Sequence, residues 1–456
     1  MSESRRKGLH GISNQLKDQL IQRMMERRLR RAAAGPEAAW AEAAVEDGED
    51  AAQNIPEAHW RLALHPGYQQ LRIMREGAAS LRIANPYFRP HDGVAGARTS
   101  IEGREYVNFS SYNYLGLCGD ARVNAAAKEA IDRYGTSVSA SRLVSGERPV
   151  HRALEARLAE AYGVEDCLAF VSGHATNVST IGYLLGPKDL VLHDALIHNS
   201  ITQGITLSGA QRGVFPHNNM DALEEILRRE RRRFERVLIV VEGVYSMDGD
   251  FADLPRLVEL KRRYRALLMV DEAHSFGVMG RRGLGIREHF GIEGSQVDIW
   301  MGTLSKALAA CGGFVAGERA LIENLKFAAP GFVYSVGMPP PVAAAALAAL
   351  ECMLAEPERV QRLQERGREF LRLAREAGVG TGTSEGYAIV PAITGSSIRA
   401  ARLSQALHQR GINVQPIVYP AVQENSARLR FFVSSQHSSE QIRSTVAVLS
   451  EELEAL

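Results

Sequence analysis

The chain has 456 residues, of which 45% are hydrophobic, and its formal net charge is +1 at pH 7. A chain of this length and composition can bury one large core and carry a smaller second domain. The near-neutral charge argues against a general polyanion-binding surface, so nucleic acid is not an expected partner.

No segment approaches the ~18 consecutive apolar residues of a membrane-spanning helix, and no charged-then-apolar signal peptide opens the chain. The four cysteines are far apart, with no C-x-x-C pair and no metal-ligand spacing: Cys118, Cys167, Cys311 and Cys352. This pattern is typical of reduced thiols. We therefore expect a cytoplasmic protein with no metal centre and no membrane span.

The first 56 residues differ in charge from the rest of the chain. Residues 1–35 are rich in Lys and Arg, and their apolar residues recur every four positions: Ile12, Leu16, Leu20 and Met24. This spacing predicts a basic amphipathic helix, and the Ala-rich acidic stretch over 36–56 is typical of a linker. The helix can be a solvated extension, a docking segment for a partner protein or a transit peptide, although its acidic residues disfavour the last.

From about Tyr106 the pattern becomes that of an α/β domain. Helical stretches such as Met220–Arg233 and Leu254–Tyr264 alternate with short apolar runs. These runs are Cys167–Val171, Leu190–His193, Val237–Val241, Leu267–Val270, Asp298–Met301 and Gly313–Ala316. Because the runs are apolar on both faces, they predict a mostly parallel sheet covered by helices on both sides.

A run of three prolines, residues 339–341, precedes a region rich in Ala, Leu, Glu and Arg that predicts helix to about Ala377. A smaller α/β segment follows, with Tyr387–Ile393 and Arg428–Val433 as its clearest strands. We therefore expect four parts: an extension over 1–56, an N-terminal arm over 57–105, a large domain over 106–341 and a small C-terminal domain over 342–456.

Residues with chemical function cluster where the predicted strands end. Ser172-Gly173-His174 opens a helix after one strand, and the free N–H groups there can hold a phosphate. Asp271 ends another strand, and Lys306 follows a Gly-Thr-x-Ser turn. A lysine can hold pyridoxal phosphate (PLP) as a Schiff base, an Asp can pair with its pyridine nitrogen, and hydroxyls can take its phosphate. This layout predicts a PLP site.

The run Val270–His274 also matches the metal-binding strand of a nucleotide-driven helicase. That class of enzyme requires a phosphate-binding loop of the form G-x-x-x-x-G-K-[ST], and the dipeptide Gly-Lys occurs nowhere in the chain. The sequence therefore disfavours an NTPase.

A series of motifs in order along the chain carries a resemblance to a known family. The motifs are Asn108–Leu117, Val144–Gly146, Asp194 with His198, Glu242–Gly249, Val270–His274, Gly302–Lys306, Tyr334–Pro340 and Arg428–Arg430. They resemble the α-oxoamine synthases, which include 8-amino-7-oxononanoate synthase, 2-amino-3-ketobutyrate CoA ligase, 5-aminolevulinate synthase and serine palmitoyltransferase. The resemblance implies the α/β fold of fold-type I PLP transferases, with a mostly parallel central sheet and a smaller C-terminal α/β domain.

The resemblance also implies three catalytic residues. Lys306 would bind PLP covalently and then move protons at the substrate Cα. Asp271 would keep the pyridine nitrogen protonated, so that the ring accepts electrons. His198 would stack on the ring and reach the substrate carboxylate.

The remaining cofactor contacts follow from the same resemblance. His274 and Ser246 would hydrogen-bond around the phenolic oxygen of PLP. The phosphate would lie on the backbone N–H groups of Gly173 and His174 and on the Thr303 hydroxyl.

Three further positions concern the substrates and a partner subunit. Arg430 matches the family arginine that binds the substrate carboxylate, for which a planar two-pronged donor is suited. Ser335 matches a position that reaches the phosphate from the neighbouring subunit, so the resemblance implies a homodimer with shared active sites. Tyr112 stands where much of the family has Asn, near the acyl donor, as in serine palmitoyltransferases and in synthases of polyketide or nonribosomal peptide assembly.

The implied reaction is a decarboxylating condensation of a small amino acid (Gly, Ala or Ser) with an acyl thioester, which gives an α-amino ketone. The thioester can be carried by CoA or by an acyl carrier protein, and the basic N-terminal helix with Asn85–Gly93 favours the carrier. An aminotransferase or a 2-amino-3-ketobutyrate-type lyase would use the same lysine and aspartate. An inactive partner subunit of a synthase heterodimer is the non-enzyme alternative, but such subunits lack the lysine.

Overall fold

The computed structural model describes residues 55–456, so the predicted basic helix and nearly all of its acidic linker lie outside the described residues. The chain divides into two compact units, Met1–Arg82 and Ile83–Leu456. The described part of the first unit contains α4 (Glu57–Trp60), the 3-10 turn η1 (Leu62–Leu64) and α5 (Pro66–Ser80). Among residues 55–456, no helix has the length and apolar character needed to cross a membrane.

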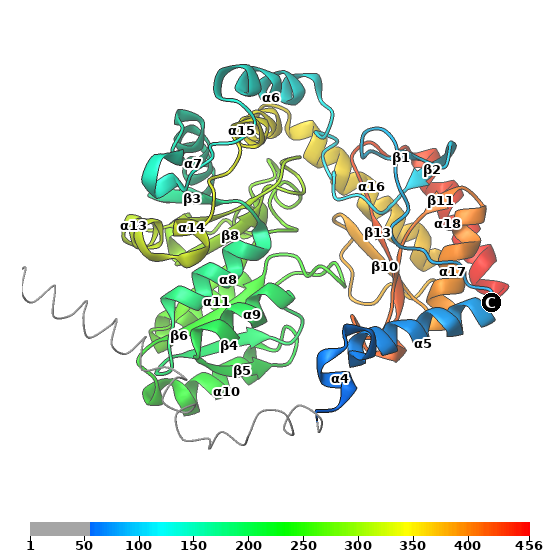
Figure 1. Cartoon of the computed structure of the whole chain (residues 1–456), viewed down its shortest axis with the longest axis horizontal. Helices are drawn as coiled ribbons and strands as arrows, with labels where there is room; N and C mark the ends of the chain where they lie inside the picture. The colour runs from blue at the N-terminus through cyan, green and yellow to red at the C-terminus, as the bar shows by residue number, and fades with distance from the viewer. Residues whose placement is uncertain (1–54) are drawn as a thin grey trace, which may run out of the picture. The chain divides into compact units, whose positions relative to one another are not determined.

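A seven-stranded sheet forms the centre of the second unit. In spatial order its strands are β3 (Asp166–Phe170), β9 (Gly313–Gly317), β8 (Ile299–Thr303), β7 (Leu267–Asp271), β6 (Val237–Glu242), β4 (Leu190–Asp194) and β5 (Gln211–Phe215). Only β9 runs antiparallel to its neighbours β3 and β8. The predicted mostly parallel sheet is confirmed, and the carboxyl ends of the other six strands lie along one edge (Figure 1).

In every strand except the edge strand β5, alternate residues enter two hydrophobic cores, one on each face of the sheet. In β6, Val237, Ile239 and Val241 belong to one core, and Leu238 and Val240 belong to the other. Each fully buried side chain of this kind contributes about 1.5–3 kcal/mol relative to exposure. Burial on both faces is the reason that these strands are continuous apolar runs in the sequence.

Helices cover both faces. The first core is closed by α6 (Ala121–Tyr134), α7 (Pro149–Tyr162), α10 (Met220–Glu230), α11 (Leu254–Tyr264), α12 (Gly285–Phe290) and α15 (Pro340–Ala355). The second core is closed by α8 (Gly173–Leu184), α9 (Asn199–Ser208), α13 (Arg319–Ala328) and α14 (Pro330–Val333).

A smaller antiparallel sheet lies in the C-terminal part of the chain. It joins β10 (Ile389–Ile393), β13 (Arg428–Phe432) and β12 (Pro416–Ile417). With it pack α16 (Pro357–Glu376), α17 (Ser397–Gln409) and α18 (Ser439–Glu454) (Figure 1). A third sheet pairs β1 (Arg98–Ile101) and β2 (Arg104–Asn108) with β11 (Ile412–Asn413). The segment just before Tyr112 is thereby tied to the C-terminal part.

Two details differ from the sequence pattern. The helical region after the three prolines is two helices, because α15 ends at Ala355 and Pro357 begins α16; a proline in a helix interior removes a backbone hydrogen bond. The edge strand β5 was not predicted, since only its last residue, Phe215, is fully buried and it therefore shows no apolar run.

Candidate active site

The carboxyl ends of the parallel strands bring the predicted site residues together. Asp271 ends β7, Thr303 ends β8 with Lys306 three residues later, and His198 follows the turn after β4. These side chains line a cavity of about 360 Å³. All the predicted site residues except Ser335 line it: Tyr112, Gly173, His174, His198, Ser246, Asp271, His274, Thr303, Lys306 and Arg430.

Lys306 lies deep in this cavity. Burial lowers the pKa of its amine to about 8, although the nearby carboxylates of Asp271 and Glu242 act in the opposite direction. Its Nζ lies 5.6 Å from the centroid of the Tyr112 ring. The lowered pKa increases the fraction of neutral amine near pH 7, which is the form that attacks a carbonyl or accepts a proton.

A chain of hydrogen bonds connects Asp271 to His198. Asn177 Nδ2 donates to Asp271 Oδ2 at 2.9 Å and to Ser200 Oγ at 3.0 Å. Ser200 Oγ lies 2.7 Å from His198 Nδ1, and the Ser200 backbone N–H also donates to that nitrogen. His198 therefore accepts at Nδ1 and keeps its proton on Nε2. Burial lowers the pKa of His198, which favours this neutral ring.

Asn177 was not singled out from the sequence, although it belongs to the Ser172–Asn177 run that opens α8. It lies four residues after Gly173 and so on the same face of the helix, which is a signal that could have found it. The amide oxygen of this side chain, Oδ1, is buried and has no hydrogen-bond partner among the described residues.

His274 is held by a tyrosine that the sequence did not point to. The Tyr114 hydroxyl lies 2.8 Å from His274 Nδ1, and both side chains are buried. Burial lowers the pKa of His274 well below its usual value, so the ring is neutral. Since Nδ1 is occupied, Nε2 is the ring nitrogen left for the cavity.

Glu242 and Arg430 bring two unpaired polar groups to the cavity. Glu242 ends β6 opposite Asp271, and burial, followed by the Asp271 charge, raises its pKa to about 8. Its Oε2 accepts from the Ser246 N–H at 3.2 Å, whereas Oε1 has no hydrogen-bond partner within residues 55–456. Arg430 donates from Nη1 to the Ser246 carbonyl at 2.8 Å, and its buried Nε has no partner in the part of the chain that the structure describes. Such groups are costly unless a ligand satisfies them.

The residues present fit PLP. Gly173 begins α8, where first-turn N–H groups have no partner within the helix, and a Cβ at this position would lie 3.0 Å from Thr303 Oγ1. The cavity thus offers N–H and hydroxyl donors for a phosphate, a carboxylate for the ring nitrogen and an amine for a covalent bond. Ser335 does not line it within one chain, and its hydroxyl donates to the Val336 carbonyl at 3.2 Å.

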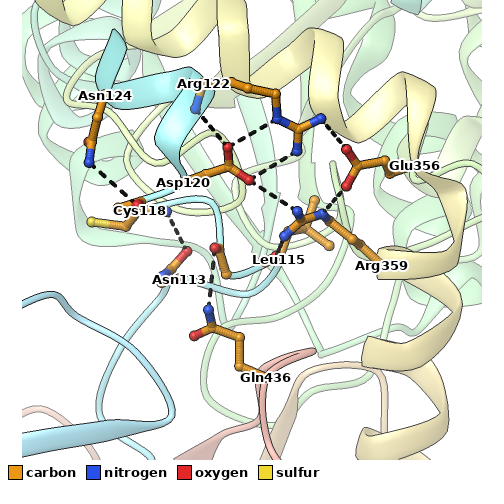
Figure 2. Close-up of polar contacts among 11 residues, drawn as sticks. Asn113, Leu115, Cys118, Asp120, Arg122, Asn124, Glu356, Arg359 and Gln436 are labelled. Carbon is orange, nitrogen blue, oxygen red and sulfur yellow. Dashed lines mark hydrogen bonds and ion pairs between the residues drawn. The ribbon is translucent and has the colours of Figure 1, made fainter.

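Ion pairs and hydrogen bonds hold the loop that contains Asn113 and Leu115 (Figure 2). Arg359 Nη1 donates to the Leu115 carbonyl at 3.2 Å, and its Nη2 donates to Asp120 at 3.0 Å. Asp120 and Glu356 each pair with both Arg122 and Arg359. This network joins the start of α6 and the start of α16 to the loop, which also carries Tyr112 and Tyr114.

Comparison with known proteins agrees with this geometry. Residues 104–449 match the family model for aminotransferases of class I and II. The chain is 43% identical over 350 residues to 8-amino-7-oxononanoate synthase of Symbiobacterium thermophilum, which covers 77% of this chain and 89% of that protein. The same enzyme of Geobacter sulfurreducens is 44% identical over 360 residues, or 78% of this chain and 91% of that one. The chain belongs to the α-oxoamine synthase family.

Solved structures place this α-oxoamine synthase in the same fold. Serine palmitoyltransferase from S. paucimobilis has a TM-score of 0.83 at 29% identity and covers 87% of this chain and 99% of that one. 8-Amino-7-oxononanoate synthase from Francisella tularensis has a TM-score of 0.68 at 26% identity, with 77% and 98% covered. The chain is therefore a fold-type I, PLP-dependent acyltransferase that condenses an amino acid with an acyl thioester with loss of CO2.

Proposed function

We propose that Lys306, Asp271, His198 and Arg430 carry out this condensation on a small amino acid, Gly, Ala or Ser. One observation carries the proposal: these four side chains come from segments around four different strands and line a single cavity. When bound there, PLP supplies an electron sink for the carbanion that forms at the substrate Cα.

Each side chain then has one task. Lys306 Nζ holds the cofactor and later takes the proton from Cα, for which its lowered pKa of about 8 is suited. Asp271, oriented by Asn177 and by the Ala273 N–H at 3.0 Å, keeps the ring nitrogen protonated. His198 offers Nε2–H to the substrate carboxylate, with Arg430 as the second donor.

The other predicted residues position the cofactor. Ser246 and His274 Nε2 bind its phenolic oxygen, and the N–H groups of Gly173 and His174 with the Thr303 hydroxyl bind its phosphate. The cavity of about 360 Å³ must hold PLP as well as the amino acid, and this favours an amino acid with a small side chain.

A second, wider cavity supports an acyl thioester as the other substrate. Its volume is about 700 Å³, and it shares Tyr112, Ser305 and Lys306 with the first cavity. Many of its lining side chains carry hydroxyl, amide or basic groups: Arg89, His91, Thr99, Asn108, Ser110, Ser111, Asn113 and Gln415. Such groups suit the amide-rich pantetheine arm that CoA and acyl carrier proteins share. Tyr112, at the junction, would contact the arriving acyl group.

The direct test is an assay of the purified chain with Gly, Ala and Ser against octanoyl to palmitoyl thioesters. We expect equal release of thiol and CO2 with one amino acid. Thiol release without CO2 would contradict the condensation, and turnover of amino acids without any thioester would support an aminotransferase or lyase. An inactive partner subunit would show neither product, although Lys306 stands here in its complete motif.

The basic N-terminal segment leads us to propose an acyl carrier protein as the natural donor. Carrier proteins are acidic as a rule, and opposite charges speed association. We expect faster turnover with the acyl carrier than with the matching acyl-CoA, and we expect removal of residues 1–56 to slow only the carrier reaction. Equal rates on both donors with no effect of the truncation would rule out docking through this segment.

We further propose a homodimer with shared active sites, working in the cytoplasm. Ser335 does not line the cavity of its own chain. Its neighbours Tyr334 and Val336 are 86% and 52% exposed, and Val144 is 82% exposed. Ser141 donates to the Val333 carbonyl at 2.7 Å, so these apolar residues lie in neighbouring segments. An exposed apolar patch of this kind is typical of a subunit interface. The four cysteines are free, in keeping with a reducing compartment.

Replacing Arg430 by Lys is expected to raise the KM for the amino acid by about 10-fold or more, because a single ammonium cannot make the two parallel bonds of a guanidinium. The KM for the thioester is expected to stay unchanged. Arg443→Lys, an exposed position on α18, is the matched control. An unchanged amino acid KM in Arg430→Lys would remove Arg430 from the carboxylate site.

A further inference from the structure

An imidazole lies between two carboxylates outside the lining of the catalytic cavity. His217, between β5 and α10, places Nδ1 2.9 Å from Asp194 Oδ1 and Nε2 2.8 Å from Asp250 Oδ2. Asp194 is 0% exposed and Asp250 is 7% exposed. Because each ring nitrogen faces a carboxylate oxygen, both nitrogens carry a proton and the ring is a cation. None of the three residues lines the cavity around Lys306.

The Asp194 side of this triad fixes the turn that carries His198. Asp194 is the last residue of β4, and its Oδ1 also accepts from the Leu196 N–H at 2.8 Å. Its Oδ2 accepts from the Asn218 N–H at 2.8 Å, next to His217. His198 is the N-cap of α9 at the end of this short turn. The direction of the turn therefore decides where the His198 ring lies.

The Asp250 side fixes the loop that carries Ser246. The Asp250 carbonyl accepts from the Tyr245 N–H at 2.8 Å, which closes the loop. Thr383 Oγ1 donates to Asp250 Oδ2 at 2.8 Å and so connects the loop to the C-terminal part of the chain. The Tyr245 ring meets the His217 ring edge-on, with the centroids 4.5 Å apart. The loop over residues 245–250 and the His217 ring therefore pack against each other.

We propose that His217 is a positioning residue that ties the His198 turn to the Ser246 loop and thereby sets the distance between these two groups across the PLP site. The inference rests on the roles proposed above for His198 and Ser246. Burial lowers the pKa of His217, but its hydrogen bonds to Asp194 and Asp250 outweigh burial and raise the pKa to about 10. The His217 ring therefore stays protonated at neutral pH and keeps both of its hydrogen bonds to the carboxylates.

The charges around the ring give this role a distinctive pH signature. The groups around it are the carboxylates of Asp194 and Asp250, the ring of Tyr245 and, through Asp250, the hydroxyl of Thr383. A neutral side chain at position 217 leaves two carboxylates facing each other in a buried space. At low pH one of the two carboxyl groups keeps a proton and can still hydrogen-bond to the neutral side chain. At higher pH that proton leaves, and the hydrogen-bonded connection between the His198 turn and the Ser246 loop is lost.

The test is His217→Gln in the full chain, with the Kd for PLP measured by titration of the cofactor-free protein from pH 6 to 9. We expect the Kd in the variant to rise with pH, by on the order of 10-fold at pH 9 relative to the unaltered chain. The unaltered chain is expected to show no corresponding rise. His217→Gln/Asp250→Asn is expected to remove the pH dependence, because it leaves only one carboxylate.

His151→Gln is the matched control, since His151 is a buried imidazole on α7 that does not line the cavity. It is expected to lower thermal stability without changing the pH dependence of PLP binding. Unaltered PLP binding by His217→Gln at every pH would overturn the proposal, and so would a pH-independent loss that follows thermal stability. Because PLP binding needs no acyl donor, the outcome of this test does not depend on whether the condensation assay succeeds.

Discussion

Replacing Lys306 by Ala is expected to abolish covalent attachment of PLP and to lower kcat for the condensation by about 10³-fold or more. Lys306 lines the catalytic cavity, and its amine is proposed both to bind PLP and to take the proton from the substrate Cα. The variant therefore loses both the bond to the cofactor and the base. Treatment with borohydride followed by mass measurement reports the attached PLP, and thiol release reports kcat.

Lys128→Ala is the control for this variant, because Lys128 is an exposed lysine on α6. It is expected to retain both covalent PLP and activity. Thermal unfolding of the Lys306 variant is a second check, since the loss of a long side chain from a cavity should leave the two hydrophobic cores intact. PLP that remains covalently attached in Lys306→Ala would mean that the lysine is misassigned.

Replacing Asp271 by Asn is the second change with a large expected effect. The neutral amide cannot hold a proton on the pyridine nitrogen, so the ring accepts electrons less readily and proton removal from Cα slows, by on the order of 10²- to 10³-fold. Covalent attachment of PLP through Lys306 is expected to remain. Exchange of the Cα hydrogen of the amino acid in heavy water, without any thioester, measures the affected step directly.

Asp253→Asn is the comparison variant. Asp253 is an exposed carboxylate that caps α11 by accepting from the Arg256 N–H at 3.2 Å. Its replacement is expected to cost at most about 1 kcal/mol of stability and to leave hydrogen exchange at Cα unchanged. A normal exchange rate in Asp271→Asn would remove the carboxylate from the cofactor site.

The fold was largely predictable from the sequence, because strands buried on both faces must be apolar throughout. The runs over Leu190–His193 and Leu267–Val270 each became a strand of the central sheet. The antiparallel direction of β9 was not predictable, since an apolar run carries no sign of direction. The edge strand β5 lacks the run altogether. The four domain boundaries stay a prediction, and the predicted basic helix lies outside the described residues.

The candidate site was predictable to the extent that its residues follow strands directly. Asp271, Thr303 and Lys306 lie at or just after strand ends, and parallel strands end at the same edge. Tyr114 and Asn177 were not predicted, although Tyr114 lies within the Asn108–Leu117 motif and Asn177 follows the Ser172-Gly173-His174 turn by three residues. Their roles come from hydrogen bonds to His274 and Asp271, which lie 160 and 94 residues away in sequence.

The sequence by itself determined the mostly parallel sheet and the family, because burial and strand-end chemistry leave local patterns; the set of residues that bind PLP stays a prediction from the same patterns. Only the tertiary structure decided that His198 accepts at Nδ1, that Glu242 Oε1 has no hydrogen-bond partner among residues 55–456, and that His217 lies between two carboxylates. The physical reason is that hydrogen bonds and charge pairs form between side chains from distant segments. Which side chains become partners depends on the order of the strands and on separations of a few ångströms, and no short stretch of the sequence specifies either.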